Sequence, residues 1–133
     1  MGLTGSNNDA SNAKAFDSEV AKANAAHADY FISIHVDGGA PSGVLGMYFT
    51  GDDKSQDYSE RFARAISAAT GLPFRGTRGH DLYSLDRSRN KSPVRILLEI
   101  GDNVHDRAFL ESPANRQKIA KALASVASGL EAQ

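Results

Sequence analysis

The chain has 133 residues, of which 15 are basic and 16 acidic, so its formal net charge is −1. This balance argues against nucleic acid or an anionic membrane surface as a partner, and no apolar run of about 18 residues predicts insertion into a bilayer. Cysteine is absent, which excludes disulfides and thiolate metal sites. A metal ion would have to be bound by His, Asp, Glu or water, and those ligands favour zinc or a harder cation.

The length predicts a single domain over residues 1–133, with 41% hydrophobic residues to form its core. Residues 1–11 are rich in Gly, Ser, Asn and Asp, and we expect them to form a loop or a disordered end. The polar start of this chain contains no apolar segment of the kind found in a signal peptide.

The first half of the chain predicts one helix and two strands. An alanine-rich segment over 12–26 has apolar residues at helical spacing. Residues 29–36 form an apolar run that is typical of a buried strand, and a Gly-rich loop over 37–43 follows it. A second strand is expected over 44–49.

A helix is predicted over 55–70, and Gly71 is the expected stop. Its apolar face carries Tyr58, Phe62, Ile66 and Ala69. Because residues 72–81 are rich in Gly, Arg and Pro, we expect irregular structure there, followed by a possible short strand over 82–85.

The last third of the chain predicts a strand and a closing helix. A polar, basic loop over 86–93 leads into an apolar strand over 94–100, and residues 101–105 are expected to turn away from it. Ser112 is the predicted N-cap of the last helix and Pro113 its first residue. The buried stripe of this helix is predicted to consist of Ile119, Leu123, Val126, Ala127 and Leu130.

Apolar strands between amphipathic helices predict an α/β fold, with a mostly parallel twisted sheet flanked by helices on both faces. In such a fold, ligands and catalytic groups lie at the carboxyl ends of the strands. His35 and Glu99 each stand near the end of a predicted strand. A carboxylate in an apolar strand is costly to bury unless its pKa rises or a cation lies beside it, and both conditions suit a general base that activates water.

Both residues also have a structural interpretation. His35 would then be a hydrogen-bonded histidine at a strand end, although Asp37 lies on the same side of an extended chain and a Gly-rich loop follows. Glu99 would form a salt bridge to Arg95 or to an arginine of the 87–89 loop.

The other histidines and basic residues are less specific. His27 is expected to cap a helix or lie on the surface, and His80 to lie in a solvated loop, with contact to substrate as the alternative. His105 closely follows the strand that carries Glu99, a position that could bring it near the site. Five basic residues between positions 75 and 91 are Arg75, Arg78, Arg87, Arg89 and Lys91. They form either a solvated loop or a patch that binds an anionic polymer or a peptide carboxylate.

Several segments, taken in order, resemble the zinc-dependent N-acetylmuramoyl-L-alanine amidases of the amidase-3 type, which occur in bacteria and in phage endolysins. Residues 23–37, ANAAHADYFISIHVD, are similar to the family's "AN…AD.FISIHAN" strand. Residues 75–85 contain RG and LYSL, which resemble "RG…LYVL", and residues 94–101, VRILLEIG, resemble "AVLVELG". The resemblance covers residues 15–131.

This resemblance implies that His35 is a zinc ligand and that Glu99 is the catalytic glutamate. The implied reaction is hydrolysis of the amide between N-acetylmuramic acid and L-alanine in peptidoglycan, at a periplasmic, secreted or phage-delivered location in the cell envelope. The family's domain begins with two further zinc ligands, a His and a Glu. This chain has no match for them, since no His precedes His27 and Glu19 falls in the wrong helix.

The zinc site is therefore expected to be incomplete in this chain, because catalytic zinc sites usually have three protein ligands. The chain would be part of a longer enzyme, would complete its site with another chain, or would be a non-catalytic peptidoglycan-binding or regulatory module. The absence of the family's first strand would also leave a sheet edge free to pair with a second copy, which predicts a homodimer.

Overall fold

The computed structural model describes residues 13–129, so the loop expected over 1–11 lies outside the described residues, as does Leu130. In chain order the elements are α1 (Ala13–Ala25), β1 (Tyr30–Asp37), β2 (Val44–Tyr48), α2 (Asp53–Thr70), β3 (Phe74–Gly79), the 3-10 helix η2 (Tyr83–Leu85), β4 (Val94–Asp102), α3 (Arg107–Glu111) and α4 (Pro113–Ala127). Within the described range, no helix is both long enough and apolar enough to cross a membrane.

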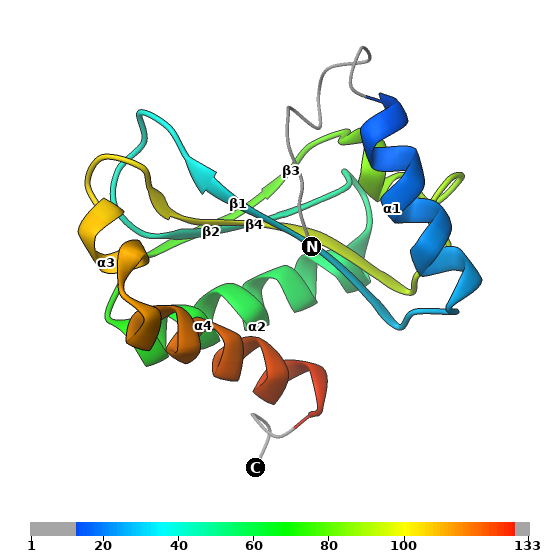
Figure 1. The fold of residues 1–133 in the computed structure, drawn as a ribbon. Coiled ribbons are helices and arrows are strands. Elements are labelled where there is room, and N and C mark those ends of the chain that lie inside the picture. Colours follow the sequence, from blue (N-terminus) through cyan, green and yellow to red (C-terminus); the bar gives the residue numbers. More distant parts are fainter. Residues whose placement is uncertain (1–12, 130–133) are drawn as a thin grey trace.

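The strands form one twisted sheet in the order β1-β4-β2-β3 (Figure 1). β1 runs parallel to β4 and β2 runs parallel to β3, while the central pair, β2 and β4, is antiparallel. The prediction of a mostly parallel sheet is therefore confirmed. In the described part of the chain β1 pairs only with β4, so its outer edge has no strand beside it.

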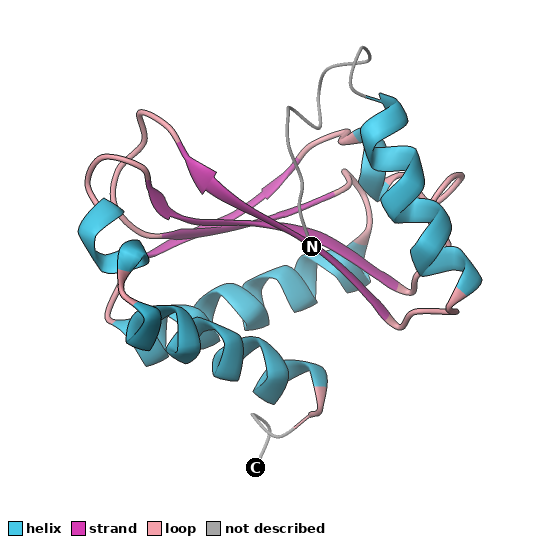
Figure 2. Cartoon of the chain, viewed as in Figure 1, coloured by secondary structure: helices cyan, strands magenta, loops and turns pink. Residues whose placement is uncertain are grey.

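Helices cover both faces of the sheet, as the alternation of elements predicted (Figure 2). On one face α2 and α4 lie side by side, and the buried side chains between them and the sheet include Phe62, Ile66, Ile96, Leu98, Ile119 and Val126. On the other face α1 and η2 form a smaller core consisting of Val20, Phe31, Leu82, Leu85 and Leu97. Among the described elements, α1 covers only the end of this face where β1 begins (Figure 1).

The predicted helix ends are largely confirmed. Asp52 caps α2 by accepting a hydrogen bond from the Ser55 amide at 3.1 Å, so this helix begins two residues before the predicted start. Gly71 ends it in the left-handed conformation, with φ of 81°. Ser112 and Pro113 begin α4 as expected.

Individual side chains depart from the predicted helix faces. Ala69 and Ala127 are exposed rather than buried, and each lies in the last turn of its helix. Tyr58 and Leu123 are half-buried, and Ala122 is buried in α4 although it was not expected to be.

Two predictions for the middle of the chain were wrong. Residues 74–79 form the edge strand β3 rather than irregular structure, because backbone pairing with β2 outweighs a poor strand sequence. Residues 83–85 form η2 rather than a strand. Leu82 and Leu85 are three positions apart and both pack into the smaller core. A 3-10 turn places residues three apart on the same side, whereas a strand would point them to opposite faces. The short helix α3 was not predicted.

Candidate active site

His35 and Glu99 lie directly opposite one another at the carboxyl ends of two neighbouring parallel strands. In the ladder between β1 and β4, His35 is the register partner of Glu99. Register partners in adjacent strands project to the same face of a sheet. This is the face of α1 and η2, since Phe31 and Leu97, which lie in phase with the two residues, belong to the smaller core. The juxtaposition expected from the sequence is therefore present.

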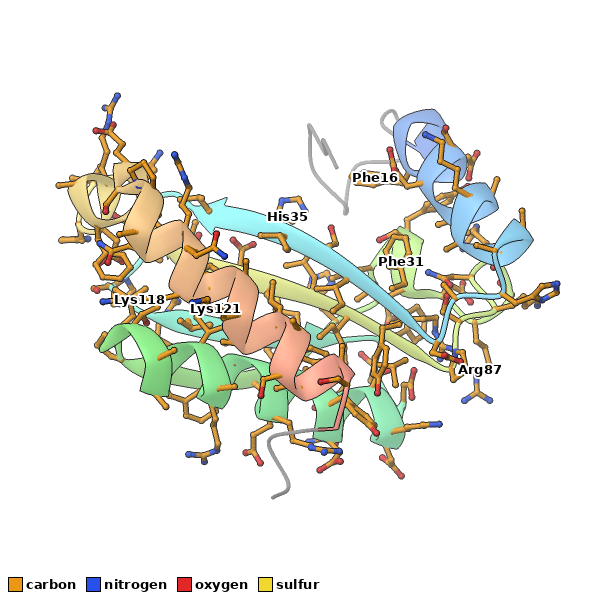
Figure 3. All side chains as sticks on the ribbon, turned by 60° about the horizontal axis from the view of Figure 1, so that its bottom comes forward. Phe16, Phe31, His35, Arg87, Lys118 and Lys121 are labelled. Carbon is orange, nitrogen blue, oxygen red and sulfur yellow. The ribbon has the colours of Figure 1, made fainter. Side chains whose placement is uncertain are left out.

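His35 is half-buried and has one hydrogen-bond partner among the described residues. Its Nε2 lies 2.9 Å from the hydroxyl of Ser33, which is fully buried two residues earlier on the same face of β1. Burial lowers the pKa of the imidazole below its usual value, so the ring is neutral at neutral pH. Figure 3 shows Phe16, a residue of α1, and Phe31 at the end of the sheet that α1 covers, while His35 stands farther along β1, clear of that helix and on the side away from α4.

Glu99 carries a carboxyl oxygen that has no hydrogen-bond partner among residues 13–129. Its Oε2 is buried and forms no hydrogen bond in the described part of the chain. Burial, and then the negative charge of Asp37, raise the pKa of the carboxyl, while Arg75 acts in the opposite direction.

The salt-bridge interpretation of Glu99 is wrong. The Arg95 side chain is buried and pairs instead with Asp52, and it also donates to the carbonyls of Leu85 and Ser92. Among the described residues, the recorded ion pair of the 87–89 loop joins Arg89 to Asp86 and does not reach Glu99.

Asp37 and Arg75 form an ion pair close to Glu99. Arg75 is the second residue of β3, and its Nη1 donates to Oδ2 of Asp37 at 3.2 Å. The contact spans the sheet, because β1, which carries Asp37, and β3 lie at opposite edges. The other oxygen of Asp37 accepts the Gly38 amide at 2.8 Å. The sequence pattern gave no signal for this pair, because 38 positions separate its members.

Two buried aspartates fasten the Gly-rich loop that follows β1. Asp102 accepts from the amides of Ala40, Val104 and His105, and these N–H groups, that of His105 above all, hold the pKa of its carboxyl well below the usual range. Asp106 accepts from the Ser42 hydroxyl at 2.5 Å and from the Gly43 amide at 3.3 Å. These hydrogen bonds hold the loop in place beside the carboxyl ends of β1 and β4.

The remaining histidines do not join the site. His27 and His80 are exposed, as predicted. His105 is exposed and its Nδ1 lies 2.9 Å from Asp102 and 3.1 Å from the carbonyl of Ala40, so it belongs to the loop anchor rather than to Glu99.

The described residues do not fit a complete zinc site. Residues 13–129 contain no group of three or more His, Cys, Asp or Glu side chains that could hold a metal ion. The chain has four histidines, all of them described, and the only side-chain hydrogen-bond partner of His35 among the described residues is Ser33, not another histidine. What the site does provide is one neutral imidazole, one unpartnered carboxyl and an adjacent ion pair.

The profile of the N-acetylmuramoyl-L-alanine amidase family matches residues 3–128, almost the whole chain. The chain belongs to this family. A comparison with curated protein sequences found no match.

Solved structures of amidases share the fold. An N-acetylmuramoyl-L-alanine amidase of Clostridium difficile is 19% identical with a TM-score of 0.76, over 89% of this chain and 66% of that one. The catalytic domain of an amidase of Bacillus (Paenibacillus) polymyxa is 23% identical with a TM-score of 0.73, again over 89% and 66%. An amidase of Nostoc punctiforme is 25% identical with a TM-score of 0.72, over 86% and 64%. The chain therefore spans slightly less than two thirds of the length of these amidases.

Proposed function

We propose that this protein hydrolyses the amide between N-acetylmuramic acid and L-alanine in peptidoglycan, and that it acts in the cell envelope. Family membership supports the reaction and the substrate. The observation that supports a role for particular residues is the buried oxygen of Glu99, which has no partner within the described residues and lies directly opposite His35. Natural folds seldom leave a buried carboxyl oxygen without a partner, and such exceptions gather at functional sites.

Glu99 is proposed to act first as general base and then as general acid. Its carboxylate takes a proton from water as the water oxygen bonds to the carbonyl carbon of the amide. The protonated carboxyl then gives that proton to the departing nitrogen as the carbon–nitrogen bond breaks, so the acid and the amine leave with Glu99 ionised again. A raised pKa suits both steps, because the group must hold the proton briefly and then release it.

His35 is proposed as one ligand of a zinc ion, with its other ligands supplied from outside residues 13–129. When bound, zinc would polarise the carbonyl and make water more acidic. A second copy of the chain is one source of ligands, since the outer edge of β1 is free to pair in the described structure. The imidazole is suited to this role because its lowered pKa keeps it neutral.

The second candidate is a non-catalytic module that binds or regulates peptidoglycan without cutting it. The observation in its favour is the absence of a metal-holding group among residues 13–129. Both candidates use the same surface, and they differ in whether Glu99 is needed.

Glu99→Gln separates the two candidates. It keeps the size of the side chain and removes its proton chemistry, so release of peptide from purified cell walls should fall about 10²- to 10⁴-fold while binding to the walls is retained. Glu111→Gln is the matched control, because Glu111 is an exposed residue of α3 and should leave both measurements unchanged. If the wild type holds no zinc and releases no peptide, and Glu99→Gln binds walls as the wild type does, the non-catalytic module is the correct function.

A further inference from the structure

The five basic residues between positions 75 and 91 do not form one patch. Arg87 is exposed and lies far from His35, near the start of β1 (Figure 3). Arg89 is bound to Asp86 at 2.8 Å and stacks on the Tyr83 ring at 4.1 Å, and Lys91 donates to two carbonyls of its own loop. Arg78 is exposed. Arg75 differs from these four, because it is mostly buried and pairs with a residue of the candidate site.

Within residues 13–129, most of the hydrogen-bonding capacity of Arg75 is unused. Its Nη1 binds Asp37, whereas its Nε and Nη2 have no partner among the described residues. Neither nitrogen is among the enclosed unpartnered atoms, so both remain open to solvent although only 17% of the side chain is exposed. A guanidinium presents its donors as a planar fork that matches the two oxygens of a carboxylate. The pair with Asp37 uses one arm of that fork.

The path of Arg75 is fixed by the backbone beneath it. A Cβ at Gly43 would lie 2.8 Å from Cγ and 3.0 Å from Cδ of Arg75, and 2.4 Å from the carbonyl oxygen of Pro73. The aliphatic part of the Arg75 side chain therefore packs directly against the backbone of Gly43, where any larger residue would collide with it. Gly43 also has φ of 132°, which disfavours other residues, and Asp106 holds its amide. The guanidinium is thus positioned before any ligand arrives, and such preorganisation lowers the cost of binding.

We propose that Arg75 is a substrate-binding residue of this site and that it grips a free carboxylate of the peptide joined to the scissile amide. This inference rests on the proposed function for the identity of the ligand. Asp37 holds the guanidinium next to Glu99, and the unused donors bind the peptide. A substrate with an ionised side chain or free terminus near the amide is then preferred over its amidated form. The alternative explanation is that Arg75 only neutralises the charge of Asp37 and does not contact the substrate.

Binding of two small probes tests the ligand without requiring turnover. The probes are N-acetyl-L-alanyl-D-glutamate with free carboxylates and the same dipeptide with its carboxylates amidated, each titrated into the full chain and followed by NMR. The wild type should bind the free acid about tenfold more tightly, the ratio expected for one charge-assisted contact. Arg75→Gln should remove that preference, and Arg78→Gln, an exposed arginine of the same strand, should retain it. Equal affinity of the wild type for both probes, or no binding of either, overturns the proposal.

A pair of variants distinguishes gripping a ligand from neutralising Asp37. If Arg75 only neutralises Asp37, then Asp37→Asn combined with Arg75→Gln removes both charges and restores wild-type behaviour. If Arg75 grips the ligand, the double variant remains unable to prefer the free acid. Should Arg75→Gln fail to fold, as judged by circular dichroism, Arg75→Lys serves instead. It keeps the charge but not the fork, and should lose most of the preference.

Peptide release from cell walls distinguishes failure of this inference from failure of the proposed function. If the wild type cuts walls but Arg75→Gln cuts free-acid and amidated walls with the wild-type ratio of rates, the inference is wrong and the function stands. If the wild type cuts nothing but prefers the free-acid probe through Arg75, the binding inference stands and the hydrolytic function is wrong.

Discussion

The features of Glu99 that suit the proposed chemistry also reduce the stability of the fold. The Glu99 carboxyl is largely buried and lies near the negative charge of Asp37, and one of its oxygens has no partner in the part of the chain that the structure describes. Each of these features disfavours the ionised form in the folded protein. Sites that hold a reactive group in this way often reduce the stability of the fold that carries them.

We predict that Glu99→Gln stabilises the fold at neutral pH while it slows the proposed hydrolysis. The folded pKa of Glu99 is raised, so the stability it contributes is present below its unfolded pKa and is lost as pH rises through its folded pKa. Glutamine does not titrate. The midpoint of thermal unfolding should therefore be higher for Glu99→Gln than for the wild type at pH 7, and the difference should shrink in acid.

The measurement is a series of thermal melts from acidic to neutral pH, with Glu111→Gln as the control. Because Glu111 is exposed, its substitution should give the same melting curve as the wild type at every pH. A lower midpoint for Glu99→Gln at pH 7 would show that the carboxylate has a stabilising partner that the structure does not contain.

The sequence alone was sufficient to find the two central residues but not their surroundings. His35 and Glu99 could be predicted because each interrupts an apolar strand near its carboxyl end, where α/β sheets gather functional groups. The contacts of Ser33, Asp37 and Arg75 could not be predicted. These contacts depend on which strands are neighbours and on the path of a long side chain across the sheet. The order of residues along one segment gives no information on either.

At the scale of elements, the contact between β2 and α2 depends on a glycine. A Cβ at Gly46 would lie 2.6 Å from the carbonyl oxygen and 2.9 Å from the carbonyl carbon of Ser59. These are backbone atoms of a helix interior, which cannot move aside without shifting α2. The glycine therefore sets the distance at which this helix packs on the sheet.

We predict that Gly46→Ala lowers the free energy of unfolding by about 1–3 kcal/mol, the usual cost of forcing an extra methyl group into a packed interior. Gly38→Ala is the control, since the nearest atom to its Cβ would be the Asn103 side-chain nitrogen at 3.8 Å, and the change should be within about 0.5 kcal/mol. Urea unfolding of both variants measures the difference. Equal stabilities would mean that α2 can be displaced freely from β2.

The buried pair of Arg95 and Asp52 joins three segments of the chain. Both side chains are 7% exposed, and Arg95 also binds carbonyls on either side of the basic loop. We predict that Arg95→Met costs about 3–5 kcal/mol, because it leaves the Asp52 charge buried without a partner. Arg107→Met, which breaks an exposed pair with Glu111, should cost less than about 1 kcal/mol. Similar costs for the two variants in chemical unfolding would contradict a structural role for Arg95.

The elements that the sequence predicted well are those with strong local signals. α2 has a capping aspartate, an apolar face and a terminal glycine, and α4 has a serine cap followed by proline. β3 has none of these signals, because its FRGTRG sequence lacks the apolar alternation of a strand and it forms by pairing with β2. η2 was predicted as a short strand because LYSL is a brief, mostly apolar run, but its two leucines are three positions apart and reach the same core only through a tight turn.

For the molecule as a whole, metal binding is expected to be coupled to association of two chains. A ligand that binds only the folded state stabilises it by about 2.7 kcal/mol when its free concentration is about 100 times its Kd. A complete catalytic zinc site would give this stabilisation at low zinc concentrations, because three protein ligands bind the ion tightly. Residues 13–129 offer His35 without two further ligands beside it.

We therefore predict that zinc does not change the thermal midpoint of the dilute monomer, and that a chelator does not lower it. If two copies pair along the free edges of β1, the face that carries His35 and Glu99 continues from one copy into the other, and ligands can come from both. Zinc should then raise the midpoint only as the protein concentration rises, in step with a dimer seen by sedimentation. His35→Ala should remove this effect, whereas His80→Ala, an exposed histidine, should retain it. One tightly held zinc per chain in the dilute monomer would mean that the chain completes the site by itself, and pairing of copies would then have no part in metal binding.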